Sequence, residues 1–175
     1  MSDVYTTDDS WMENVDFTDV EQRIAAIDKR CVNTFNGMLG IRFPYLSTDK
    51  VVAELDISPR LYQPFGFLHG GVTLALIESA ASRAADMRTD FSKERPFGVH
   101  IEVDHKKPGK QGVLRATAVF DHQEKNKQIW NVEVRDEDDD IVSDGIFITK
   151  IVSLERLAEK ERERERERER AQAQN

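Results

Sequence analysis

One short stretch of the sequence brings together groups that can activate a carbonyl. Gln63 lies on a turn, and His69 follows on the same loop. Gly70 and Gly71 come next and open an apolar stretch that predicts a helix. The first N–H groups of a helix have no intrahelical acceptor and lie at the positive end of its dipole, and glycine lets a ligand approach them. The stretch therefore predicts a cradle for an anion or an oxyanion.

The predicted helix, from Gly70 to about Met87, carries a carboxylate two turns from its start. At about 100° per residue, its polar side chains fall on one stripe of an otherwise apolar surface. They are Glu78, Ser79, Ser82, Arg83 and Asp86. This stripe is either a solvent-facing strip or the wall of a cleft, and the groups at the helix start favour the cleft. In a cleft Glu78 would be poorly solvated and suited to act as a general base.

Another helix is predicted earlier in the chain. Thr18 and Glu21 have the spacing of a capping box, in which each side chain satisfies a free backbone donor. Apolar residues then recur at intervals of three and four and predict a helix from about 19 to 36. Gly37 follows where a left-handed cap would end this helix.

Strands are predicted where apolar and polar residues alternate. These segments are 39–43, 50–57, 97–104, 114–120, 130–134 and 141–152. The connections 106–112, 121–127 and 136–140 are turn-like and short enough for hairpins. The order of elements predicts an α+β domain in which an antiparallel sheet packs on one central helix, and the short turns exclude a doubly wound parallel sheet.

The composition excludes several classes of protein. A net charge of -8 and a pI of about 5.1 argue against a duplex nucleic-acid binder and against attachment to anionic lipid. Cys31 is the single cysteine, and the four histidines form no cluster with it, so we expect neither a disulfide framework nor a metal site. The acidic N-terminus lacks a signal peptide and no run suits a membrane span, so we expect a cytoplasmic protein.

The charge surplus lies mainly at the ends of the chain. Residues 1–16 alternate acidic and small polar groups and predict a flexible arm before a folded domain at 17–152. Residues 153–175 contain a Glu/Arg alternation at 161–170 and have no apolar face to bury. We expect this tail to be solvated and partly helical rather than an interaction module.

The run Gln63-Pro64-Phe65-Gly66-Phe67-Leu68-His69-Gly70-Gly71, with Glu78-Ser79 and Ser82 beyond it, resembles hotdog-fold acyl-CoA thioesterases of the PaaI-like type. Among these, the sequence is most similar to the dihydroxynaphthoyl-CoA and hydroxybenzoyl-CoA hydrolases. The resemblance covers about 37–152, including 99–105 and 128–132, and it implies a hotdog fold. The helix residues around the acid, 73–77 and 80–81, depart from the naphthoyl-specific members, so the acyl group is less defined than the reaction.

The resemblance also implies roles for particular residues. Glu78 would be the nucleophile or the base that activates water, and the Gly70 N–H would polarise the thioester carbonyl. His69 and Gln63 would hold the carbonyl and the water, and Ser82 would support the acid or the acyl group. The site is shared between two subunits in this family, so a homodimer is the minimum active unit and a homotetramer is the expected assembly.

Coenzyme A would enter as part of the substrate, and no separate cofactor is implied. Its phosphates need a local basic patch on an acidic protein, and the turn at 106–112 supplies Lys106, Lys107 and Lys110. The alternative is that these lysines only keep a turn soluble. Relatives place a basic residue at Lys107, and His105 and His122 match histidines of close relatives without a defined role.

Two other functions remain open from the sequence. A hotdog hydratase or dehydratase also works at a helix start, although the His-Gly-Gly turn argues against it, and product analysis separates it because only hydrolysis releases a thiol. A non-catalytic acyl-CoA sensor or scaffold would bind ligand without turnover, and its activity would depend on the tail at 153–175.

Overall fold

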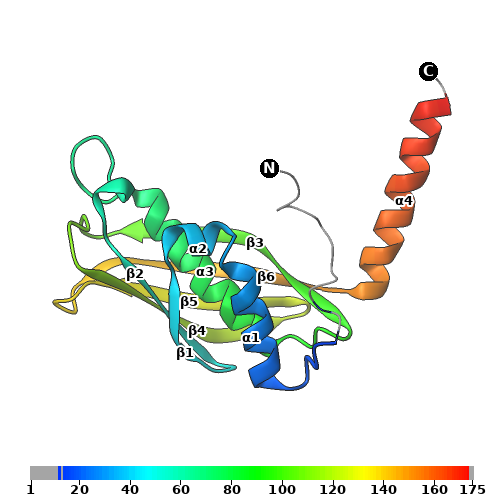
Figure 1. The fold of residues 1–175 in the computed structure, drawn as a ribbon, viewed down its shortest axis with the longest axis horizontal. Coiled ribbons are helices and arrows are strands. Elements are labelled where there is room, and N and C mark those ends of the chain that lie inside the picture. The colour runs from blue at the N-terminus through cyan, green and yellow to red at the C-terminus, as the bar shows by residue number, and fades with distance from the viewer. Residues whose placement is uncertain (1–11, 13, 174–175) are drawn as a thin grey trace.

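The computed structural model describes residue 12 and residues 14–173, and in them a curved sheet lies against one long helix (Figure 1). The helices are α1 (Val20–Cys31), α2 (Phe35–Leu39), α3 (Gly70–Arg88) and α4 (Leu154–Ala173), with a short 3-10 turn at Pro59–Leu61. The strands are β1 (Arg42–Leu46), β2 (Lys50–Asp56), β3 (Glu94–His105), β4 (Val113–Glu124), β5 (Lys127–Arg135) and β6 (Ile141–Ser153). The predicted α+β class is confirmed.

The sheet is antiparallel throughout, in the order β1-β2-β4-β5-β6-β3. The hairpins predicted at 121–127 and 136–140 are confirmed, because they join neighbouring strands. The hairpin predicted at 106–112 is wrong, because β3 pairs with β6 at the far edge and the segment crosses over to β4. Alternation shows that a segment is a strand but not which strand it pairs with.

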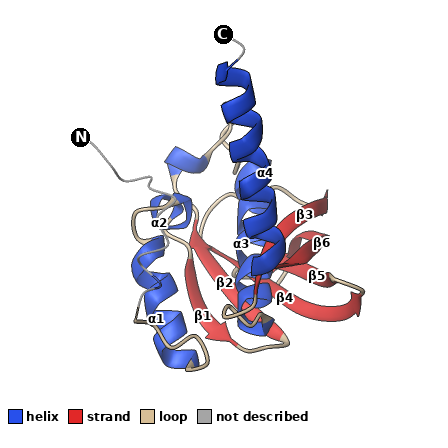
Figure 2. Ribbon diagram, turned by 90° about the vertical axis from the view of Figure 1, so that its right-hand side faces the viewer, coloured by secondary structure: helices blue, strands red, loops and turns tan. Residues whose placement is uncertain are grey.

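The core lies between α3 and the sheet, whose strands curve around this helix in Figure 2. Inward residues of β2, β4, β5 and β6 are fully or almost fully buried, as the alternation required, whereas Phe97 and Val99 of β3 are exposed. The largest of these buried strand residues are Trp130, Phe147, Leu55, Leu114, Val51, Val134 and Val142. On α3 the contact face contains four fully buried alanines, Ala80, Ala81, Ala84 and Ala85. Alanine adds only a methyl group, so the helix can sit close to the strands.

The predicted first helix is in fact two helices, α1 and α2, separated by a short turn. The Thr34 hydroxyl donates to the Cys31 carbonyl at 2.7 Å, which stabilises the break. Gly37 does not end a helix but lies inside α2, where a Cβ would collide with the Val32 carbonyl oxygen. The left-handed cap is Gly40, at φ +72°, and β1 therefore begins later than predicted.

The capping box predicted for the start of α1 is also wrong by one residue. Asp19 is the N-cap, and its carboxylate accepts from the N–H groups of Glu21 at 2.9 Å and Gln22 at 3.1 Å. The Thr18 hydroxyl instead donates to Asp16 at 2.6 Å. Asp and Thr are both good caps, so local propensity alone could not choose between them.

The tail is helical over most of its length and stands away from the sheet (Figure 1). Beyond Leu157 the described residues of α4 whose side chains are placed are all exposed, as a helix without an apolar face requires. The predicted N-terminal arm, 1–16, falls almost wholly outside the described residues. No helix in the part of the chain that the structure describes is long and apolar enough to cross a membrane.

Candidate active site

The loop before α3 is held in a tight turn. The Gln63 N–H donates to the Phe67 carbonyl at 2.8 Å, and the Gly66 N–H donates back to Gln63 at 3.0 Å. Gly66 has φ +80°, a conformation that glycine adopts without strain. The Leu68 N–H then donates to the Gly109 carbonyl at 3.0 Å, which attaches this loop to the segment 106–112. The crossover segment is therefore what sets the position of the α3 start.

His69 is the N-cap of α3. Its Nδ1 accepts a hydrogen bond from the Gly71 N–H at 2.9 Å, so Nδ1 carries no proton and the neutral ring is protonated at Nε2. The His69 side chain is exposed. Nε2 is thus the atom of this ring that can donate to a substrate or to water.

The Gly70 N–H has no hydrogen-bond acceptor among the described residues. His105 lies against this glycine, with Nε2 at 3.0 Å from the position that a Cβ would occupy. The other ring nitrogen, Nδ1, is 2.9 Å from the Ser143 hydroxyl oxygen. A side chain at Gly70 would therefore crowd the imidazole, which would have to move by a few tenths of an ångström.

A cavity of about 360 Å³ opens in front of this N–H. Gln63 and His105 line it together with Gly70, Lys106 and Lys107. The structure thus brings four kinds of predicted group to one place: an amide, an imidazole, a free backbone donor and lysines. The alternation of the strand placed His105 only at a strand end, and the position of β3 beside α3 is what brings it to the helix start.

Glu78 lies farther along α3 and is exposed in the single chain, which contradicts the expectation that it is poorly solvated. Its Oε1 is 3.5 Å from the position of a Cβ on Gly98 of β3. Ser82 follows one turn later and is partly buried. At a rise of 1.5 Å per residue, Glu78 lies about 12 Å from Gly70 along the helix. One chain therefore cannot place both groups on the same carbonyl.

The rest of the polar stripe is not continuous with Glu78. The Ser79 hydroxyl donates to Asn36 at 2.8 Å, and the Arg83 side chain, 3% exposed, pairs with Asp28. These contacts cover this side of α3 with α1 and α2. Burial raises the pKa of Asp86 to about 7, although Arg83 opposes the shift. The stripe thus divides into an open face with Glu78 and Ser82 and a covered face, which the helical wheel could not distinguish.

Two of the three predicted coenzyme A lysines already pair with carboxylates. Lys106 lies 3.2 Å from Asp144, and Lys107 lies 2.7 Å from Asp136. These hydrogen bonds raise the pKa of both lysines. Lys110 has no carboxylate partner within the described residues and lies over the Phe67 ring, 5.5 Å from its centroid.

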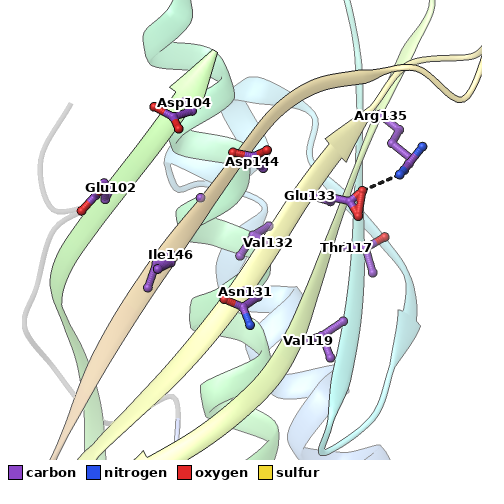
Figure 3. Close-up of a pocket in the computed structure, with 11 residues that line it drawn as sticks. Glu102, Asp104, Thr117, Val119, Asn131, Val132, Glu133, Arg135, Asp144 and Ile146 are labelled. Carbon is purple, nitrogen blue, oxygen red and sulfur yellow. Dashed lines mark hydrogen bonds and ion pairs between the residues drawn. The ribbon is translucent and has the colours of Figure 1, made fainter. Parts of the chain in front are cut away.

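A second hollow, of about 490 Å³, lies on the outer face of the sheet, away from α3 (Figure 3). Its carboxylates include Glu102 on β3, Asp144 on β6 and Glu133 on β5, the last of which pairs with Arg135 at 2.5 Å. None of the predicted site residues lines it. In the described part of the chain, no group of three or more His, Cys, Asp or Glu side chains could hold a metal ion.

The sheet curved around one long helix defines a hotdog-fold protein. A solved structure of a mutant of thioesterase PA1618 from Pseudomonas aeruginosa has a TM-score of 0.70 to this chain, with 26% identity over 78% of this chain and 95% of that one. The fold implied by the sequence is therefore confirmed.

The sequence comparisons give the family. Residues 65–143 match the family described as thioesterase superfamily. The chain is 35% identical over 99 residues to 1,4-dihydroxy-2-naphthoyl-CoA hydrolase of Listeria monocytogenes, covering 57% of this chain and 80% of that protein. It is 33% identical over 101 residues to the Escherichia coli protein of the same name, covering 58% of this chain and 74% of that protein. The chain belongs to the thioesterase superfamily, and its class of enzyme is thioester hydrolase.

Proposed function

We propose that the protein hydrolyses an acyl-CoA thioester to a free acid and coenzyme A. The observation that carries this proposal is the free N–H of Gly70 at the start of a long helix, beside the ring of His105. A thioester carbonyl in the cavity would accept from this N–H, and the helix dipole would stabilise the oxyanion that forms. Gln63 and the Nε2 atom of His69 are the side-chain donors that would orient the carbonyl and the attacking water.

The acid would come from a second subunit. The 12 Å rise between Gly70 and Glu78, of about two helical turns, excludes attack within one chain. β3 lies at the edge of the sheet with Glu78 beside it, so a second copy that pairs along this edge would bring its own α3 close. Two equivalent sites would result, each with the helix start of one subunit and the Glu78 of the other. A homodimer is then the minimum active unit.

The chemistry at this site has two forms, and both consume water. In one, the Glu78 carboxylate attacks the carbonyl carbon, the C–S bond breaks, and water then hydrolyses the acyl anhydride. In the other, Glu78 takes a proton from water as the water attacks, and the thiolate leaves and is protonated. Ser82, one turn after Glu78, would hydrogen-bond the acid or the acyl group in either form.

We infer an aromatic acyl group as the substrate, with a medium-chain acyl group as the alternative. The names of the Listeria and Escherichia coli relatives support the aromatic class. Lys110, which lacks a carboxylate partner in the described chain, is the lysine that suits the phosphates of coenzyme A best. We assign the activity to residues 17–152, with no separate cofactor, and expect it in the cytoplasm.

The proposal is tested by thiol release from a panel of aromatic and aliphatic acyl-CoAs. We expect Glu78→Gln to lower kcat by at least about a hundredfold, because loss of a nucleophile or base removes transition-state stabilisation. Glu102→Gln is the matched control, since Glu102 is also an exposed glutamate beside the same edge but lies on β3 away from the cavity.

Each outcome of this assay separates one function from another. Equal activity of wild type and Glu78→Gln would remove Glu78 from the mechanism. Binding of acyl-CoA without thiol release would favour the sensor, and a dehydrated or hydrated acyl-CoA without free thiol would favour the hydratase or dehydratase.

A further inference from the structure

A basic hollow lies at the end of the molecule where α4 begins. Its volume is about 640 Å³, and residues from the end of α3, the β4–β5 hairpin, β6 and the first turns of α4 line it. Five cationic side chains contribute: Arg88, Lys125, Lys150, Arg156 and Lys160. Glu94 is the one carboxylate among the lining residues of this part of the described chain. This is a concentration of positive charge in a protein of net charge -8.

Arg88 pairs with Asp49 and Arg156 pairs with Glu159, whereas the three lysines of the hollow are not neutralised within the described chain. Within residues 14–173, Lys125, Lys150 and Lys160 have no carboxylate at ion-pair distance. Lys150 also lies directly opposite Lys127 in the β5–β6 ladder. Glu124 lies opposite Lys127 on the other side, so this row of the sheet keeps one excess positive charge that an anion bound here would neutralise.

The hollow also has a buried neutral donor. Gln128 lines it and is only 4% exposed. Its Oε1 accepts a hydrogen bond from the Thr149 hydroxyl at 3.4 Å, which leaves its Nε2 group as a donor. A fixed amide donor beside several lysines is a suitable environment for phosphate oxygens.

α4 supplies part of this wall. Arg156 and Lys160 are four positions apart in α4, so they lie on the same face of the helix. The helix follows the residues that match the family, 65–143, and is therefore an addition to the matched region. Arg88 lies about 27 Å from Gly70 along α3, so the hollow is distinct from the carbonyl cradle of the same chain.

We propose that this hollow binds a phosphate-rich ligand of nucleotide size. Its volume is in the range of small-molecule sites, and lysine and arginine side chains are the usual partners of phosphate. The phosphates would belong either to a free nucleotide or to the phosphorylated end of coenzyme A. The first turns of α4 would then complete a binding site.

The test is calorimetric titration of the full chain with inorganic triphosphate, ADP and coenzyme A at low ionic strength, without metal. We compare Lys125→Gln/Lys160→Gln with Arg164→Gln/Arg168→Gln, which also removes two positive charges but from the exposed part of α4. We expect the first pair to weaken binding by about tenfold, because each partly exposed charge contributes modestly, and the second pair to leave it unchanged.

Two results would overturn the proposal: no binding of any probe by wild type, or equal weakening in both double variants. Tighter binding of coenzyme A than of ADP, with a raised KM for acyl-CoA and unchanged kcat in Lys125→Gln/Lys160→Gln, supports the coenzyme end as the source. Comparable binding of ADP with an unchanged KM supports a free nucleotide. Because binding is measured directly, this test stands whether or not the protein releases thiol.

Discussion

Gly70 illustrates how a single position is constrained by a neighbour far along the chain. A Cβ at this position would crowd the ring of His105, whose Nε2 would lie 3.0 Å from it. That ring is in turn fixed by Ser143 through its Nδ1. Gly70 has a free N–H and lines the cavity with His105, so the packing and the proposed chemistry involve the same pair of residues.

We predict that Gly70→Ala lowers kcat/KM for thiol release by about tenfold or more, because the added methyl displaces the imidazole beside the oxyanion donor. In a His105→Ala background, Gly70→Ala should lower kcat/KM much less, because the imidazole that the methyl group would displace is absent. Steady-state kinetics of wild type, the two single variants and the double variant give the coupling energy between the two positions. An equal loss in both backgrounds would show that the collision does not matter.

Asp86 makes the stability depend on pH. Burial disfavours the charged form of this carboxyl and raises its pKa in the folded chain to about 7. In an unfolded chain, the pKa of an aspartate is about 3.9. The folded state therefore binds a proton that the unfolded state has lost, and stability falls as pH rises through this interval.

We predict that Asp86→Asn removes this dependence. Between pH 5 and pH 8, the free energy of unfolding of wild type should fall by roughly 2–3 kcal/mol relative to the variant. Urea denaturation of both proteins at the two pH values measures this difference. If the free energies of unfolding of wild type and variant differ by the same amount at pH 5 and pH 8, Asp86 is ionised throughout.

At the scale of elements, α1 attaches to α3 through polar contacts as well as apolar ones. Arg23 of α1 is 7% exposed and donates to the Met87 carbonyl at 3.4 Å at the end of α3. Arg83 of α3 is buried between Asp28 and the Phe43 ring, and its Nε and Nη1 groups have no partner in the described structure. A buried guanidinium with unsatisfied donors makes this contact sensitive to the loss of the Asp28 carboxylate that it pairs with.

We predict that Asp28→Ala lowers the free energy of unfolding by about 1–3 kcal/mol, because it removes the carboxylate that pairs with the buried Arg83 side chain. The double variant Asp28→Ala/Arg83→Met should recover most of this loss, since methionine fills a similar space without a charge. Urea denaturation of the three proteins tests the pair. A double variant no more stable than Asp28→Ala would contradict the expectation.

At the scale of the whole molecule, the open edge of the sheet and its open outer face are two different surfaces. β3 presents Phe97 and Val99, which are 45% and 50% exposed, beside the edge next to Glu78. The outer face presents Val119 and Ile146, which are 43% and 41% exposed, at the hollow of Figure 3. The first surface suits the proposed dimer, and the second is available for joining two dimers.

We predict that Val99→Lys produces a monomer that releases no thiol, because a charged side chain at a sheet edge opposes strand pairing. Val119→Lys is the matched control on the outer face and should keep the dimer and its activity, even if it separates a tetramer. Light scattering coupled to gel filtration, with the thiol assay, measures both. An active Val99→Lys monomer would refute the shared site.

The sequence by itself determined most of the elements and the position of the candidate site at the start of the long helix. The long helix at 70–88, the strands around it and the His69-Gly70-Gly71 turn follow from local periodicity and from residue types within a few positions of one another. The family motif lies in the same continuous stretch. These features need no knowledge of distant contacts, so they could be predicted.

The tertiary structure alone decided which surfaces meet. It paired β3 with β6, divided the polar stripe of α3 into covered and open faces, and brought His105 to Gly70. It also joined Lys106 to a carboxylate on β6 and Lys107 to one in the β5–β6 turn. Each of these depends on residues far apart in the chain, and local periodicity carries no information about which distant partner a given face will bury against.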